Sequence, residues 1–289
     1  MKPKLTRRQF LAGTLAGSAA LYSPGLLARG SRPASMTDRV TLGHTGIRPS
    51  YLGFGTGTRG WDKQSNQTRL GGAAFVRMIR HALEQGISYF DAADIYGTHY
   101  LLRSALRGVP REQVVLETKI WYRTSKGARQ DLDRFRRELG TDYIDMVHIH
   151  AVSDAPWGPP IREAMDALAA AKEQGIIRAH GMSIHSLEAL QAAAASPWVD
   201  MVLARINHRG QNMDGAPEVV VPVLQQLRAA GKGVSGIKIL AEGALAGERQ
   251  QSLRYVLGLD CVQAVVIGFE STEQVDDILR LGNALLAGR

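Results

Sequence analysis

The stretch Tyr143-Ile144-Asp145-Met146-Val147-His148-Ile149 is a short run dominated by apolar and β-branched residues. Residues 160–174 follow it with apolar side chains at helical spacing, and the next apolar run spans Ala179–Ser183. Two parallel strands need a crossover connection between them, and this connection is usually a helix. The segment therefore predicts a βαβ unit.

The same alternation continues in both directions, from about residue 40 to the last residues. Further predicted strands are Tyr51–Gly55, Ser88–Ala92, Val114–Thr118, Met201–Ile206, Val234–Ile239 and Ala264–Gly268. Further predicted helices occupy residues 67–85, 98–107, 126–139, 186–195, 217–230, 248–257 and 272–286. Eight strands and eight helices within one domain's length predict a (β/α)₈ barrel. An open doubly wound sheet is the alternative, but it seldom needs eight such units.

Turn residues support these boundaries. Glycines stand just past four predicted helices, where a left-handed C-cap is expected, and prolines stand near two helix starts. These residues are Gly86, Gly140, Gly175, Gly231, Pro160 and Pro217. Before the first strand, two short apolar segments flank Gly43-His44-Thr45-Gly46, which predicts a short N-terminal β-hairpin over residues 40–49.

The first 35 residues differ from the rest. Basic residues precede the apolar run Phe10–Leu21, and a stretch with glycine and proline follows, as in an export signal. The Arg7-Arg8 pair within Thr6–Leu11 resembles the twin-arginine signal, which sends folded proteins to a translocase in the bacterial inner membrane. A membrane anchor is the alternative, but the run is shorter than the ~20 residues of a span. We predict a signal peptide over 1–35, a barrel domain over 36–289, a periplasmic location and no stable membrane span in the mature chain.

The leader also accounts for most of the charge. The chain has 35 Lys and Arg, 27 Asp and Glu and a net charge of +8. Six of the basic residues and none of the acidic ones precede Met36, so the predicted mature chain is nearly neutral. This balance gives no reason to expect nucleic-acid binding. The single cysteine, Cys261, excludes an intrachain disulfide and a cysteine-based metal site.

Polar side chains follow three neighbouring predicted strands at the points where the strands end. They are Asp91, Asp94 and Tyr96 after the second strand, Lys119 after the third, and His148 and His150 after the fourth. In (β/α)₈ barrels the chemistry collects at the carboxyl ends of the strands. We therefore expect an acid, a phenol, an amine and an imidazole to meet at one end of the barrel.

This set of groups is suited to proton transfer. A phenol has a pKa of about 10, too high for efficient proton transfer near neutral pH. The Lys119 ammonium favours phenolate and is expected to lower the pKa of Tyr96, while Asp91 keeps the ammonium charged. An imidazole beside the phenol can orient a carbonyl oxygen that is protonated as hydride reaches the carbon. Simple capping of the barrel is the alternative for any one of these residues, but it explains the whole set poorly.

With these motifs the sequence resembles the aldo-keto reductase superfamily from about residue 40 to the end. The resemblance rests on Leu52–Gly57, Phe90–Gly97, Thr118–Trp121, Tyr143–His150 and Lys172–Arg178. It implies carbonyl reduction with a catalytic tetrad of Asp91, Tyr96, Lys119 and His150. His150 falls on the family's histidine position, five residues after Asp145. We expect strand alternation to point His148 away, and we expect Asp94, His148 and His185 to be structural.

The resemblance also implies a reduced nicotinamide cofactor, usually NADPH, bound without a Gly-x-Gly-x-x-Gly turn. The implied cofactor-binding residues are Gly55, Thr56, Ser183, Lys238, Gly268, Ser271 and Gln274. Several positions depart from the family pattern. Ile184 replaces the asparagine after Ser183, Ala204 or Arg205 stands for a glutamine, and Ile237 or Lys238 stands for a stacking aromatic residue.

The expected phosphate site is also altered. Gln274 stands where the family has an arginine, and Glu270 would repel a phosphate unless it points away. The helix start at Ser271 still offers backbone N–H groups to an anion. The choice between NADP(H) and NAD(H) therefore stays open.

The leading hypothesis is reduction of a small aldehyde or ketone. Trp61, Trp121 and Trp157 lie on or beside loops at the predicted barrel mouth, where they form an aromatic wall for the substrate or merely cover the barrel. An exported barrel whose cofactor site has degenerated into a ligand- or partner-binding module is one alternative. A barrel isomerase or aldolase with Lys119 as a Schiff-base amine is another. Export further implies a tightly bound cofactor, because free nicotinamide cofactors are not expected outside the cytoplasm.

Overall fold

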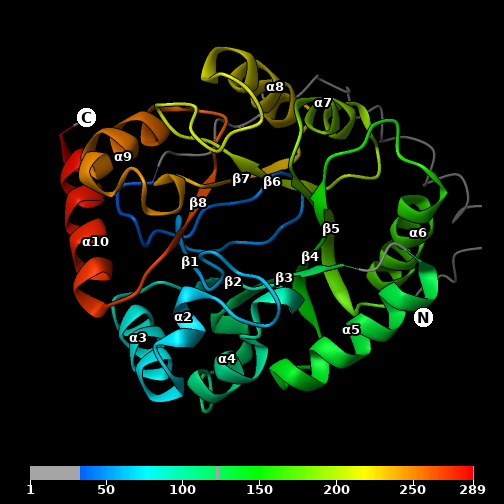
Figure 1. Cartoon of the computed structure of the whole chain (residues 1–289), viewed down its shortest axis with the longest axis horizontal. Helices are drawn as coiled ribbons and strands as arrows, with labels where there is room; N and C mark the ends of the chain where they lie inside the picture. The colour runs from blue at the N-terminus through cyan, green and yellow to red at the C-terminus, as the bar shows by residue number, and fades with distance from the viewer. Residues whose placement is uncertain (1–32, 122–123, 289) are drawn as a thin grey trace, which may run out of the picture. The chain divides into compact units, whose positions relative to one another are not determined.

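Eight parallel strands form the centre of the molecule in the computed structural model, which describes residues 33–121 and 124–288. The strands pair in sequence order, and β8 closes the barrel against β1 (Figure 1). They are β1 (Leu52–Gly55), β2 (Tyr89–Asp91), β3 (Val115–Ile120), β4 (Ile144–Val152), β5 (Ile177–Ile184), β6 (Met201–Arg205), β7 (Gly233–Ile237) and β8 (Ala264–Gly268). The predicted (β/α)₈ barrel is confirmed.

The helices surround this barrel (Figure 1). Those in the described part of the chain are α2 (Asn66–Arg69), α3 (Gly72–Glu84), α4 (His99–Ala105), α5 (Ser125–Leu139), α6 (Pro159–Glu173), α7 (Leu187–Ala195), α8 (Pro217–Ala229), α9 (Arg249–Gly258) and α10 (Thr272–Ala287). Short 3₁₀ turns are η1 (Asp94–Tyr96), η2 (Arg111–Gln113), η3 (Ala241–Gly243) and η4 (Ala246–Glu248).

The turn residues act largely as predicted. Gly86, Gly140, Gly175 and Gly231 follow helices with φ angles of 92°, 69°, 72° and 76°. These angles lie in the left-handed half of the map that glycine tolerates best. The single helix predicted over residues 67–85 is wrong, because Gly71 adopts a φ of 84° and separates α2 from α3.

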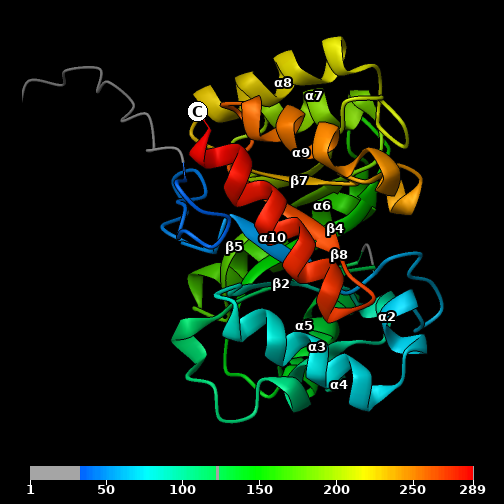
Figure 2. The ribbon, with the colours of Figure 1, turned by 90° about the vertical axis from the view of Figure 1, so that its left-hand side faces the viewer.

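The chain reverses before β1, but the predicted hairpin is not shown as a pair of strands. An isolated antiparallel bridge joins Arg39 to Ser50, and Val40 N–H donates to the Pro49 carbonyl at 2.9 Å. Leu42 and Ile47 are fully buried and belong to the cluster inside the barrel. Figure 2 shows this segment at the barrel end opposite the β1–α2 loop. The reversal therefore plugs the amino-terminal end of the barrel and leaves the carboxyl ends of the strands for the site.

The apolar core has two layers. The inner cluster fills the barrel and includes Tyr89, Val115 and Met146, whereas the outer cluster packs between strands and helices and includes Phe54 and Phe75. Alternating strand residues supply the two layers because successive side chains point to opposite faces of a strand. Each large buried side chain contributes roughly 1.5–3 kcal/mol, so these layers hold the strand ends in place.

The predicted signal peptide, except for its last three residues, lies outside the described residues. Within residues 33–121 and 124–288, no helix has both the length and the apolar character needed to cross a bilayer.

Candidate active site

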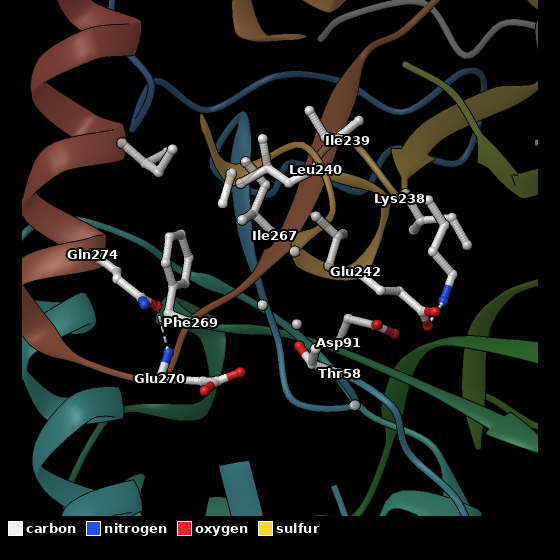
Figure 3. Close-up of a pocket in the computed structure, with 18 of the residues that line it drawn as sticks. Thr58, Asp91, Lys238, Ile239, Leu240, Glu242, Ile267, Phe269, Glu270 and Gln274 are labelled. Carbon is white, nitrogen blue, oxygen red and sulfur yellow. Dashed lines mark hydrogen bonds and ion pairs between the residues drawn. The ribbon is translucent and has the colours of Figure 1, made fainter. Parts of the chain in front are cut away.

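A cavity of about 470 Å³ opens at the carboxyl ends of the strands. Asp91, Tyr96 and Lys119 line it together with residues at the start of α10, and Figure 3 shows Asp91 well apart from Gln274 of α10. Its other lining residues come from the loops after β1, β7 and β8, and they include Thr58, Lys238, Glu242 and Glu270 (Figure 3). Its volume falls within the range of small-molecule and cofactor sites.

Asp91 and Lys119 form a buried ion pair at the cavity wall. Asp91 ends β2, and Lys119 lies near the end of β3, which is the neighbouring strand. The Lys119 ammonium donates to the Asp91 carboxylate and, at 2.8 Å, to the Ala92 carbonyl. The two side chains are 2% and 8% exposed. The ammonium also lies 5.1 Å from the centroid of the Tyr96 ring, so acid, amine and phenol meet as predicted.

Two glycines of the β1–α2 loop hold the Tyr96 ring. A Cβ atom at Gly57 would lie 2.1 Å from Cε2 of Tyr96, and one at Gly60 would lie 2.3 Å from Cδ1. These distances are far below van der Waals contact, so only glycine lets the loop approach the ring this closely. The ring is thus clamped by backbone, which leaves it little freedom to move.

An ion-pair network anchors the turn that carries Tyr96. Asp94 begins η1, pairs with Lys63 of the β1–α2 loop, and accepts from Arg134 of α5 at 2.6 Å. Arg134 also pairs with Asp131 and Glu138, at 2.6 and 3.0 Å. Burial raises the pKa of Asp94, but hydrogen bonds from Arg134 and Lys63 outweigh it, and the net pKa is lowered. Asp94 stays charged and has the structural role that we predicted.

His150 joins Tyr96 to a row of aromatic rings. Its ring centroid lies 5.7 Å from that of Tyr96 and 5.5 Å from that of Trp121, both edge to face. Trp121 in turn meets Trp61 at 5.8 Å, and these two indoles are 38% and 63% exposed. Trp157 instead packs against the outer core. His150 is beside the phenol as predicted, although it is not among the described residues that line the cavity.

The electrostatics of Tyr96 differ from our expectation. Burial is the largest influence and raises the pKa of the phenol to about 12, although Lys119 lowers it. The prediction that Lys119 brings this pKa down overall is therefore wrong, because desolvation outweighs the ammonium. Burial also raises the pKa of Asp91 to about 6 against the opposing effect of Lys119. Burial lowers the pKa of Lys119, but Asp91 and the other acidic neighbours raise it by more than burial lowers it. The net pKa is raised, so the amine stays protonated.

A second buried polar group lies inside the barrel beneath the tetrad. Glu117 accepts from the Tyr89 hydroxyl and pairs with His148, and both Glu117 and His148 are essentially unexposed. The prediction that His148 points away is wrong, since residues two apart on a strand share a face and His148 therefore faces inward with His150. The sequence reasoning missed Glu117. Its signal was its place two residues before Lys119, on the same face.

The cofactor residues implied by the resemblance divide into two groups. Gly55, Lys238, Gly268 and Gln274 line the cavity. Thr56, Ser183 and Ser271 are not among its described lining residues. Thr56 donates to the Asp91 carbonyl at 2.8 Å, Ser183 is buried in β5, and Ser271 caps α10.

The altered nicotinamide positions can now be assigned. Ile184 and Ala204 belong to the outer core, so the inward residue of β6 at this level is Arg205. Arg205 donates to Asp214 at 3.0 Å, and the side chain of Asp214 is 1% exposed. Ile237 packs against the inner cluster and lines the cavity. An aliphatic side chain therefore takes the place of the expected aromatic ring.

The cavity walls fit an extended ligand. Gly55, Gly57 and Gly268 present backbone along one side, and a Cβ atom at Gly268 would lie 2.1 Å from the Thr58 hydroxyl. Lys238 and Glu242, which also line the cavity, adopt φ angles of 59° and 57° in the loop after β7. Such strained backbone in non-glycine residues is typical of ligand-binding loops. The site thus fits a cofactor that reaches from the tetrad to the start of α10.

The closed parallel barrel, with an acid–base group at the carboxyl ends of its strands, defines a (β/α)₈-barrel protein with a site suited to proton transfer. The sequence profile of the Aldo/keto reductase family matches residues 51–254. This match covers well over half of the sequence, and the chain belongs to that family.

Individual relatives share only a modest sequence identity with this chain. L-galactose dehydrogenase of Arabidopsis thaliana is 27% identical over 221 residues, which cover 71% of this chain and 66% of that protein. The NADH-specific methylglyoxal reductase of Escherichia coli is 31% identical over 166 residues, which cover 50% of this chain and 51% of that protein. The chain spans about half to three fifths of the length of other curated relatives. The holo form of an aldo-keto reductase from Bacillus halodurans superposes with a TM-score of 0.69 at 21% identity, covering 87% of this chain and 95% of that one, which supports the fold.

Proposed function

We propose that this protein reduces an aldehyde or ketone to an alcohol with a reduced nicotinamide cofactor. The observation that carries the proposal is the placement of Tyr96, Lys119 and Asp91 together in the wall of a cavity at the barrel mouth. Family membership supports the cofactor class, and the glycine-lined walls fit an extended ligand. In this proposal the substrate carbonyl lies beside Tyr96.

The residues then divide the chemistry. When bound, the reduced nicotinamide supplies the hydride. Tyr96 donates its hydroxyl proton to the carbonyl oxygen, and its raised pKa keeps that proton in place at neutral pH. Lys119, held by Asp91, stabilises the negative charge that develops on the phenol oxygen during transfer. His150, edge to face with Tyr96, orients the carbonyl oxygen.

The aromatic row supports a substrate with an apolar or planar body. Trp61 and Trp121 present partly exposed indole surface next to His150 and Tyr96. Exposed apolar surface beside a polar reacting group is typical of binding pockets. Small dicarbonyls such as methylglyoxal, which several curated relatives are named for, and aromatic aldehydes are therefore the first substrates to test.

A Schiff-base mechanism fits this site less well. Lys119 is buried against the Asp91 carboxylate, and its pKa is raised rather than lowered. A nucleophilic lysine must lose its proton near neutral pH, which such a partner opposes. The binding-module alternative is favoured by the changed nicotinamide positions, above all by Arg205 held by Asp214.

The decisive experiment is Tyr96→Phe. We expect kcat to fall by roughly 10²–10⁴-fold, because the proton donor is removed while the ring is kept. Cofactor affinity, measured by fluorescence titration, is expected to stay within about twofold. Tyr100→Phe is the matched control, since Tyr100 is 62% exposed on α4. Unchanged kcat in Tyr96→Phe contradicts the mechanism, and failure to bind either nicotinamide cofactor favours the binding module.

We further propose that the protein is exported in folded form through the twin-arginine pathway to the periplasm. The support is the sequence of residues 1–35, with Arg7-Arg8 before the apolar run. Folded export allows the protein to carry a cofactor with it, because a tightly bound ligand stabilises the native state. Mass spectrometry of protein released from the periplasm tests for this retained cofactor.

A further inference from the structure

The amino-terminal end of α10, at the far end of the cavity, is filled by the protein's own polar groups. The Ser271 hydroxyl accepts from Gln274 N–H at 3.3 Å, and the Glu273 carboxylate accepts from its own backbone N–H and from the Thr272 hydroxyl. The Gln274 side-chain oxygen accepts from Glu270 N–H at 2.8 Å, and Figure 3 shows Gln274 turned back toward Glu270. A helix start normally offers these N–H groups to an anion. Here a carboxylate of the chain already takes that place.

The charges around this end of the cavity are also unfavourable for a phosphate. Glu270, Glu273 and Asp277 line it, and Arg249 is the one lysine or arginine among the described lining residues near α10. The Arg249 guanidinium donates to Asp277 at 2.6 Å, so its charge is largely compensated. Lys238, which the resemblance implies to be a cofactor-binding residue, pairs with Glu242 in the loop after β7.

The direction in which a nicotinamide cofactor lies follows from the proposed function. Its reacting ring must reach Tyr96 and Lys119, so its adenosine half extends toward α10, at the other end of the cavity. NADP(H) differs from NAD(H) only by a phosphate on the adenosine ribose. Carboxylates beside that ribose accept hydrogen bonds from its hydroxyls and repel the added phosphate.

We propose that this site selects NADH over NADPH and that Glu273 is the main selectivity residue, because its carboxylate occupies the anion position at the start of α10. The inference rests on the proposed function for the orientation of the cofactor. Glu270 adds to the selectivity, since its carboxylate accepts from Asn66 at 2.6 Å and is held at the cavity edge. The hydrogen bonds to Glu273 hold the pKa of its carboxyl group below the usual range, so it is charged at neutral pH.

The test is a binding measurement on the full chain by isothermal titration calorimetry with NADH and NADPH. We expect NADH to bind about tenfold more tightly, because a doubly charged phosphate meets two charged carboxylates at a partly screened surface. Raising the salt concentration is expected to reduce this ratio. Equal affinity, or tighter NADPH binding, overturns the proposed selectivity but leaves carbonyl reduction standing. Absence of binding by both cofactors overturns the proposed function and the selectivity together.

A charge reversal tests the role of Glu273. In Glu273→Arg we expect NADPH affinity to rise about tenfold or more, while NADH affinity changes by less than about threefold. Glu273→Gln, which keeps the shape, is expected to show a smaller shift in the same direction. Glu188→Arg is the matched control, because Glu188 is also the second residue of a helix capped by a serine and lies outside the described cavity lining. An unchanged affinity ratio in Glu273→Arg overturns the assignment to this residue.

Discussion

The clamp of Gly57 on the Tyr96 ring gives the sharpest prediction, through the substitution Gly57→Ala. The added Cβ atom would lie 2.1 Å from Cε2 of Tyr96, whereas ordinary contact begins at 3.4 Å. The three atoms nearest to the added Cβ all belong to the Tyr96 ring, so the ring edge must move by the difference of about 1.3 Å. Gly57 does not have a positive φ angle, so alanine is compatible with the backbone itself.

The magnitude follows from this displacement. A misplacement of about 1 Å in a reacting group costs roughly 10²-fold in rate. Overpacking at a well-packed site costs about 1–3 kcal/mol of folding stability, which a barrel of this size tolerates. We therefore expect kcat to fall about 100-fold in a protein that still folds and still binds its cofactor.

The assay follows the loss of reduced-nicotinamide absorbance at saturating cofactor with methylglyoxal or an aromatic aldehyde. Circular dichroism and thermal unfolding report whether the fold is kept. Gly247→Ala is the control, because nothing lies within 4 Å of its added Cβ atom, and its activity is expected to stay within about twofold. A folded Gly57→Ala protein with wild-type kcat would show that the position of Tyr96 does not depend on this clamp.

Three further predictions concern other parts of the protein. Burial raises the pKa of Asp91 from 3.8 to about 6, so its contribution to stability is fully present below about pH 4 and is lost as the pH rises through 6. Urea unfolding of the Asp91→Asn variant is expected to lack this component of about 3 kcal/mol, and an identical pH dependence of the two proteins contradicts it. Arg134→Met is expected to lower the free energy of unfolding by about 1–3 kcal/mol and to lower kcat, because it releases η1. Arg136 is the control, since its carboxylate partner is 61% exposed, and Arg136→Met is expected to change the free energy of unfolding by less than about 1 kcal/mol. Replacing both Arg7 and Arg8 with lysine is expected to keep the protein in the cytoplasm on cell fractionation, and undiminished export argues against the twin-arginine route.

The sequence alone determined the barrel architecture and the set of polar side chains that meet at the carboxyl ends of its strands. Alternating apolar periods predict βαβ units because strands and helices have different repeats, and eight such units in one domain's length leave the closed barrel as the simplest arrangement. Asp91, Tyr96, Lys119 and His150 were predictable because the carboxyl ends of neighbouring parallel strands lie together. Local signals of this kind need no knowledge of long-range packing.

Only the tertiary structure decided how these groups behave. The pKa of Tyr96 depends on burial by segments distant in sequence, and that burial outweighs the lysine beside it. The glycine clamp joins Gly57 to Tyr96 across 39 positions, and no local pattern specifies that contact. The carboxylate at the start of α10 became informative only when its hydrogen bonds and its place at the far end of the cavity were known. Desolvation and electrostatic selectivity arise from the whole surroundings of a group, and these exist only in the folded chain.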